Sequence, residues 1–162
     1  ALPIFVISGF FSTIGTWSYQ TITSEMVERA EKAMALTGVA HLADRFTDEM
    51  SSGEARRVLL ARALVHDPKA LILDEPSTAL DISAQHELRL TLRNLSQSGI
   101  GIVMVTHHLS DLIPEMKRVI LMDKGRVVAD GPTREVLTAP RLSALFGRPL
   151  ELLERDGYFN LW

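Results

Sequence analysis

The stretch ALILDEPSTALD, from Ala70 to Asp81, decides the fold that we predict for this chain. It opens with apolar residues only, and such a run without polar alternation predicts a strand buried on both faces. Strands of this kind occur in parallel sheets that helices cover on both sides. Pro76 ends the strand, because proline has no backbone N–H to donate to a neighbouring strand.

Two carboxylates, Asp74 and Glu75, directly follow the apolar run. In open α/β sheets, ligands bind just beyond the carboxyl ends of the strands, so chemistry is expected here. Consecutive side chains of an extended segment point to opposite sides, so we expect different roles for the two carboxylates. One can hold a hard cation, while the other can face a water molecule. An acidic pair before a turn is also common without any function, so the neighbouring motifs must decide.

The overall composition is that of a globular domain. The chain has 162 residues, of which 46% are hydrophobic and 23% are charged, which suits one domain with a substantial core. A net charge of -3 gives no electrostatic reason to expect nucleic acid as a partner. The lack of cysteine excludes disulfides and thiolate chemistry, and no apolar run reaches the ~20 residues that span a bilayer.

The residues before the strand predict helices. Residues 1–22 predict a loop or a short helical stretch in which the aromatics Phe10, Phe11, Trp17 and Tyr19 pack against other residues. The next helix is expected to begin at a Ser24 cap and to end at Gly38. A second, short helix is expected from Ala40 to Phe46.

Ser51 and Glu54 have the spacing of a capping box, which predicts a helix running to about His66. The capping box by itself explains both residues structurally. A helix start with free N–H groups, two hydroxyls and a glycine that permits close approach is also a good phosphate site, so the functional alternative stays open.

After the central strand, Ser83 is expected to cap a helix that carries apolar residues at helical spacing and ends near Ser98-Gly99. The segment Ile102–Thr106 then predicts a second buried strand, followed by His107 and His108. Neighbouring side chains of an extended segment diverge, so paired histidines make a poor joint metal site. One histidine at the end of a strand, directed at the crevice that Glu75 faces, is the better functional interpretation.

The C-terminal part predicts hairpins and short helices. Residues 118–122 and 126–130 flank Asp123-Lys124-Gly125, which is a typical hairpin turn. Pro132 and Pro140 are each expected to begin a short helix. A small terminal hairpin is expected around Asp156-Gly157.

Taken in order, the serine-glycine helix start, the Asp-Glu-Pro strand, the segment Ser77–Asp81 and the strand ending in Thr-His resemble the ATP-binding-cassette (ABC) ATPases. The match covers roughly residues 45–135. It implies an α/β fold with a P-loop NTPase-type parallel sheet and crossover helices, here incomplete, with part of a helical subdomain and C-terminal hairpins. By the same resemblance, residues 1–52 belong to the helical subdomain and residues 53–162 to the C-terminal part of the ATPase core.

The resemblance also implies which residues bind nucleotide. Residues 50–54 stand where the family has its LSGGQ signature, so Ser51, Ser52, Gly53 and Glu54 are expected to bind ATP. Ser51 and Gly53 match the signature. Ser52 stands in place of its first glycine and Glu54 in place of its glutamine, so a carboxylate replaces an amide beside the phosphates.

By the same resemblance, Asp74 corresponds to the Walker B aspartate and is expected to hold Mg²⁺. Glu75 is expected to be the general base that deprotonates the attacking water. Asp81 closes the D-loop and is expected to contribute to ATP binding at a dimer junction. His107 corresponds to the switch histidine that senses the γ-phosphate, and we count it with Glu75 as catalytic.

The expected partners also follow from the resemblance. Two such domains are expected to form a head-to-tail dimer that sandwiches two ATP molecules. The second ABC ATPase subunit and a transmembrane permease are therefore the protein partners, with no nucleic acid. The subunit is expected to be cytoplasmic and peripheral on the inner face of the cell membrane.

Two motifs of the family do not occur in the sequence. There is no Gly-x-x-x-x-Gly-Lys-[Ser/Thr] phosphate loop, which supplies the N–H cradle and the lysine for the phosphates. A Q-loop glutamine is also missing, and Gln20 does not fit that role. We therefore expect a C-terminal fragment of a longer ATPase that is inactive alone. Its sheet is expected to have open edges that favour self-association.

Two alternatives to a transporter subunit remain at this point. One is a soluble ABC ATPase of DNA repair, chromosome organisation or translation, which long coiled-coil insertions or basic patches would indicate. The other is a degenerate regulatory module that lends only its signature helix to an active partner. Co-purification with an integral membrane protein would distinguish the transporter subunit from both alternatives.

Overall fold

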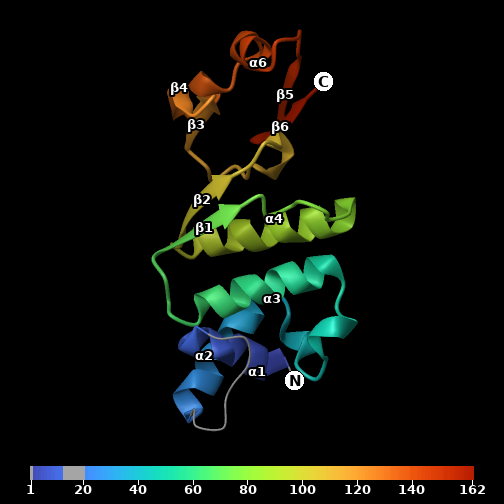
Figure 1. The fold of residues 1–162 in the computed structure, drawn as a ribbon, viewed down its shortest axis with the longest axis vertical. Coiled ribbons are helices and arrows are strands. Elements are labelled where there is room, and N and C mark those ends of the chain that lie inside the picture. Colours follow the sequence, from blue (N-terminus) through green and yellow to red (C-terminus); the bar gives the residue numbers. More distant parts are fainter. Residues whose placement is uncertain (1, 13–20) are drawn as a thin grey trace. The chain divides into compact units, whose positions relative to one another are not determined.

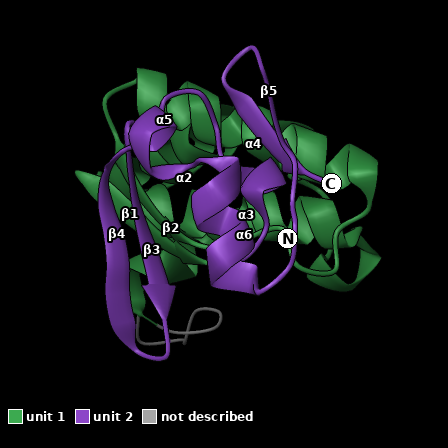
Figure 2. Ribbon diagram, turned by 90° about the horizontal axis from the view of Figure 1, so that it is seen from above, with its two compact units in different colours: residues 1–105 green, residues 106–162 purple. Residues whose placement is uncertain are grey.

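The computed structural model describes residues 2–12 and 21–162 and divides into two compact units. The units comprise residues 1–105 and 106–162, and Figure 2 gives each its own colour. This division differs from the boundary expected at residues 52/53, and the assignment of subdomains to those two parts stays a prediction. Trp17, Tyr19 and Gln20 lie outside the described residues.

The first unit stacks helices against a small sheet. Figure 1 shows α3 between α4 and the pair α1–α2, with the two strands beside α4. Its elements are α1 (Leu2–Ile7), α2 (Ser24–Leu36), α3 (Ser52–Leu64), β1 (Ala70–Asp74), α4 (Ile82–Gln97) and β2 (Gly101–Val105), with 3-10 helices at Ser8–Phe11, Ala40–Leu42 and Thr47–Glu49. Within the described ranges, no helix has both the length and the apolar character needed to cross a membrane.

The core of this unit lies between the helices. α2 and α4 each bury residues at the spacing of one face, as expected for amphipathic helices, whereas α3 packs against α4 and against the pair α1–α2. The largest apolar side chains with less than 2% exposure in this unit are Leu2, Val6, Met34, Val39, Val58, Val65, Leu92 and Leu95.

The first strand and the second form the predicted parallel sheet. β1 pairs with β2 in parallel, in a register that places Ala70 opposite Gly101 and Asp74 opposite Val105. A parallel pair needs a crossover connection, and α4 supplies it. The α/β class and the order of strand, helix and strand are thus as predicted.

The prediction that β1 is buried on both faces is wrong for this structure. Leu71 is 6% exposed, whereas its neighbour Ile72 is 80% exposed. Val103 and Val105 on β2 are each 56% exposed. Side chains alternate between the two faces of a strand, so helices cover one face of this two-stranded sheet and leave the other open.

Two helix caps lie earlier than predicted. Thr23, not Ser24, caps α2, and Asp81, not Ser83, caps α4. The Asp81 carboxylate accepts a hydrogen bond from the N–H of Ala84 at 2.8 Å. Aspartate is among the best N-cap residues, so the helix begins as soon as Asp81 is available. The C-terminal ends are as predicted, with Gly38 and Gly99 at positive φ just after each helix.

The helix predicted from Ala40 to Phe46 is only a 3-10 helix over Ala40–Leu42 followed by turns. The backbone bonds here connect residues three apart, as from Ala43 N–H to the Ala40 carbonyl at 3.2 Å. Such short 3-10 pieces serve as connectors rather than as helices of their own.

The aromatic Phe10 packs against other residues, as predicted. Its ring meets the His66 ring edge-on at a centroid distance of 5.2 Å. The Arg29 guanidinium lies 5.1 Å from the centre of the same ring. Phe10 therefore joins its own 3-10 helix to α2 and to the segment after α3.

The second unit consists of two antiparallel hairpins with short helices between them. Its elements are β3 (Arg118–Asp123), β4 (Arg126–Pro132), α5 (Thr133–Val136), α6 (Ala139–Phe146), β5 (Leu152–Arg155) and β6 (Tyr158–Leu161), preceded by a 3-10 helix at Leu109–Asp111. Their core is formed by Leu112, Leu121, Val136, Leu137, Leu142 and Phe159.

Both predicted hairpins are confirmed, and their turns explain why. Lys124 and Gly125 have φ of 47° and 75°, and Asp156 and Gly157 have φ of 54° and 80°. Two consecutive positive φ values define the turns whose twist matches that of hairpin strands. The helices predicted at Pro132 and Pro140 are also present, as α5 and α6.

Candidate functional site

The start of α3 is closed by the predicted capping box. The Glu54 N–H donates to the Ser51 hydroxyl oxygen at 3.2 Å. In return, Oε2 of Glu54 accepts from the Ser51 N–H at 2.8 Å and from the Ser51 hydroxyl at 2.9 Å. These two hydrogen bonds from Ser51 hold the pKa of Glu54 below its ordinary value. The Glu54 carboxylate therefore already occupies donors that a phosphate at this helix start would use.

We expect the capping box to contribute measurably to stability. Glu54→Ala should lower the free energy of unfolding by about 1 kcal/mol, the usual size of a lost cap. Glu54→Gln is the matched control, because glutamine can replace glutamate in a capping box. Urea titrations of the three proteins followed by circular dichroism give the comparison. A Glu54→Ala protein as stable as Glu54→Gln would contradict this expectation.

The same carboxylate predicts a pH dependence. A carboxyl group with a lowered pKa in the folded state stabilises the protein above its unfolded pKa, about 4.3 for glutamate, and stops doing so as the pH falls through the folded value. The stability advantage of the wild type over Glu54→Ala should therefore be complete near neutral pH and shrink in acid, below the ordinary glutamate pKa. The same titrations repeated from pH 7 downward measure this.

Gly53 lies against the start of α4. It is buried, and a Cβ atom placed on it would lie 2.6 Å from the Cβ of Ala84, closer than real side chains approach. The N–H of Ala84 also donates a hydrogen bond to the Asp81 carboxylate. Gly53 of the predicted signature thus meets Ala84, three residues after Asp81, where α3 packs on α4. No motif in the sequence points to Ala84, which is why the contact could not be predicted.

Asp74 and Glu75 lie at the carboxyl end of β1, as predicted. The Glu75 N–H donates to the carbonyl of Val105 at 2.8 Å, so the turn after β1 is joined to the last residue of β2. The side chain of Asp74 is exposed, and that of Glu75 is half-buried. The oxygen donor of Asp74 at this strand end fits a hard divalent cation such as Mg²⁺.

Glu75 is not part of the extended segment that we predicted. Its φ is 44°, in the left-handed region that residues other than glycine seldom adopt. The alternation argument, which assumed an extended chain at both carboxylates, is therefore wrong at this residue. Backbone strain of this kind costs on the order of 1–3 kcal/mol and is found most often at functional sites. The strain at Glu75 therefore agrees with a functional role for this residue.

His107 belongs to the second unit and follows Val105 by two residues. The N–H of His108 donates to the Thr106 hydroxyl at 3.0 Å, and that hydroxyl donates to Asp111 at 2.6 Å. The chain is thus turned by Thr106, and the two histidine rings lie 3.9 Å apart between centroids. The predicted divergence of the two imidazoles is wrong, because it assumed that the extended segment continues past Thr106.

Comparison with known proteins identifies related sequences. Residues 7–78 match the family model described as ABC transporter. The chain is 37% identical over 149 residues, 91% of its length, to the uncharacterized ABC transporter ATP-binding protein YlmA of Bacillus subtilis, of which it covers 56%. It is 41% identical over 122 residues, 75% of its length, to the hemin import ATP-binding protein HmuV of Nocardia farcinica, covering 42% of that protein. The chain thus spans about half the length of the curated relatives it matches.

Solved structures give the same result for the fold. A metal-chelate type ABC transporter in an inward-facing conformation superposes with a TM-score of 0.83 at 26% identity, over 99% of this chain and 64% of that one. CbiO1 of Clostridium perfringens, part of the ABC transporter complex cbiONQ, superposes with a TM-score of 0.69 at 31% identity, over 86% of this chain and 53% of that one. The α/β fold predicted from the central strand is therefore shared with both.

Proposed function

This chain belongs to the ABC ATPase family, and from that membership we propose that the full-length gene product is the ATP-binding subunit of an ABC transporter. In that role it couples ATP binding and hydrolysis to transport across a membrane. The observation that carries the proposal is the similarity, over 91% of the chain, to a protein named as an ABC transporter ATP-binding protein. The relatives described above are transporter proteins, so neither the DNA-repair nor the regulatory alternative is favoured.

The roles proposed for the residues follow the positions described above. Asp74 would hold Mg²⁺, which supplies positive charge to the phosphates of ATP when it is bound. Glu75 would take the proton of the attacking water. His107 would contact the γ-phosphate. The helix start with Ser51, Ser52, Gly53 and Glu54, together with Asp81, would face the ATP held by a second subunit.

Two features of the structure support this assignment. The Asp74 carboxylate is exposed at the end of a parallel strand, where an oxygen ligand can reach a hydrated cation. The N–H groups at the start of α3 carry the positive end of the helix dipole, which favours phosphate. The Glu54 carboxylate competes for the same hydroxyl, so phosphate contact there requires Ser51 to exchange its hydrogen bond.

The proposed partners are a transmembrane permease and a second ATPase subunit in a head-to-tail dimer. The subunit would then be peripheral on the cytoplasmic face of the membrane. The test is affinity purification of the tagged full-length gene product from detergent-solubilised membranes, with the ATPase rate measured on the purified material. Recovery of an integral membrane protein with ATPase activity supports the proposal. A product recovered without a membrane protein, and without ATPase activity, contradicts it.

We expect the 162-residue chain alone to bind ATP weakly and to hydrolyse it negligibly. Its sequence has no Gly-x-x-x-x-Gly-Lys-[Ser/Thr] loop, and that loop supplies the backbone N–H groups and the lysine that bind the phosphates. Phosphate release from the purified chain, measured beside the full-length gene product, tests this. Turnover by the chain equal to that of the full-length product would contradict the expectation.

A further inference from the structure

The second unit contains a cavity that the proposed function does not use. Its volume is about 280 Å³, and its walls come from three segments far apart in the sequence. These are Pro114, Met116 and Lys117 before β3, residues 132–134 at the junction of β4 and α5, and the terminal hairpin at Gly157 and Phe159. A cavity of this size is at the small end of the range for ligand sites, so it suits a compact molecule.

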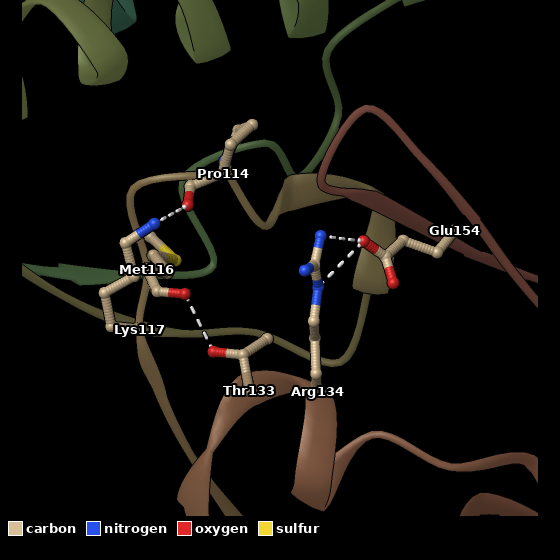
Figure 3. Close-up of polar contacts among 6 residues, drawn as sticks. All are labelled: Pro114, Met116, Lys117, Thr133, Arg134 and Glu154. Carbon is tan, nitrogen blue, oxygen red and sulfur yellow. Dashed lines mark hydrogen bonds and ion pairs between the residues drawn. The ribbon is translucent and has the colours of Figure 1, made fainter.

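Hydrogen bonds hold two of these walls together. The Thr133 hydroxyl donates to the Met116 carbonyl at 2.7 Å, and the Thr133 N–H donates to the Lys117 carbonyl at 3.1 Å. Figure 3 shows the first of these bonds. The backbone before β3 is therefore tied to the start of α5, and the position of Lys117 is set before any ligand arrives.

The third wall is the turn of the terminal hairpin, which packs closely on the first. A Cβ atom on Gly157 would lie 2.9 Å from the Cβ of Pro114. Gly157 also has a φ of 80°, which favours glycine. The turn can approach Pro114 because Gly157 has no side chain. The cavity is therefore formed by the close packing of the folded unit.

Two cationic side chains line the cavity, and only one of their charges is balanced by an acidic partner. The Lys117 ammonium donates to the carbonyl of Pro114 at 2.8 Å. A carbonyl is neutral, so this bond orients the ammonium without cancelling its charge. Nε and Nη2 of Arg134 both donate to one carboxylate oxygen, Oε1 of Glu154, at 3.0 and 2.6 Å. Figure 3 shows both cations with these partners, and the three charges sum to one positive charge.

The remaining lining is apolar. Phe159 is 6% exposed and belongs to the core of the unit. Met116 and two prolines complete this part of the wall. A ligand here would therefore meet both cationic and apolar side chains.

We infer that this cavity binds a small organic anion, with its carboxylate or phosphate group on Lys117 and Arg134 and its apolar part on Met116 and Phe159. Lys117 has three N–H donors and uses one on Pro114, so it can bind the anion without losing its present contact. The pair with Glu154 uses Nε and Nη2 of Arg134 and leaves Nη1 to the ligand. This inference does not depend on ATP binding, which involves other residues.

The test is an NMR titration of the ¹⁵N-labelled 162-residue chain. The amide resonances of Lys117, Thr133 and Gly157 are monitored during the titration. The probes are benzoate and phenyl phosphate, with benzyl alcohol and inorganic phosphate as comparisons. We expect saturable shifts at these three amides with at least one of the two aromatic anions, and no saturation with either comparison compound over the same concentrations.

Lys117→Gln should weaken binding of the aromatic anion about tenfold or more, because a hydrogen bond to a charged group is lost. Arg118→Gln is the matched control: it removes the same charge one residue further on, from a guanidinium bonded to Asp130. It should change binding less than about twofold.

Four results would overturn the inference. Equal saturation by benzyl alcohol would show an apolar hollow without anion selectivity. Equal saturation by inorganic phosphate would show an adventitious ion only. Absence of saturable shifts, or equal weakening by both substitutions, would show that Lys117 does not form a site.

Discussion

Replacing Glu75 by glutamine in the full-length gene product is expected to lower ATP hydrolysis by a factor of about 10² to 10⁴, the usual contribution of a general base. The amide has nearly the shape of the carboxylate but cannot accept a proton from water. The backbone at Glu75, with its φ of 44° and its bond to Val105, should be unaffected by the change. We therefore expect ATP binding to persist while turnover is lost.

The measurement needs both properties in one preparation. Steady-state phosphate release gives the turnover, and equilibrium binding of a fluorescent ATP analogue gives the affinity. Glu87→Gln is the matched control, because Glu87 is an exposed carboxylate on α4 and the change removes the same charge. It should leave the rate within about twofold. Wild-type turnover in Glu75→Gln would refute the role of general base, and loss of ATP binding in that variant would show a structural role instead.

Gly53→Ala is expected to lower the free energy of unfolding by about 1–3 kcal/mol, the range for an overpacked contact. The added methyl group would lie 2.6 Å from the Cβ of Ala84, so α3 and α4 would have to move apart. The same movement would shift the helix start that we propose to face ATP. In the full-length gene product, hydrolysis should therefore fall together with stability.

A double-mutant cycle assigns the loss to this contact. Ala84→Gly removes the atom that the new methyl group would meet, so Gly53→Ala should cost less in the Ala84→Gly background, with a coupling of at least about 0.5 kcal/mol. Gly131→Ala is the control substitution, because a Cβ there meets Val136 at an ordinary 3.4 Å. Equal losses from Gly53→Ala in both backgrounds would show that packing on Ala84 is not the cause.

The local structure of this chain could be predicted well where a few neighbouring residues decide it. The capping box at Ser51 and Glu54 is an example, since both partners lie within one helical turn. The turns at Lys124-Gly125 and Asp156-Gly157 are others, because the positive φ values they need are cheap for glycine. The predicted cap of α4 was wrong by only two residues, because Asp81 rather than Ser83 caps this helix.

The geometry around the predicted site residues could be predicted only in part. That Asp74 and Glu75 end a strand beside Val105 followed from the apolar run and the parallel order of the elements. The left-handed conformation of Glu75 did not, because an apolar run carries no information on how the chain leaves the strand. The approach of Gly53 to Ala84 joins positions 31 residues apart in a way that no spacing rule describes.

The sequence by itself determined the α/β class, the order of the elements, the helix caps to within two residues and the family that the chain resembles. These properties depend on patterns that are read along the chain, over one helical turn or one strand. The tertiary structure alone decided which face of β1 is covered, how Glu75 leaves the strand, and that Lys117, Arg134 and Gly157 line one cavity. The physical reason is that these features arise from contacts between segments distant in sequence, and such contacts form only when the whole unit packs.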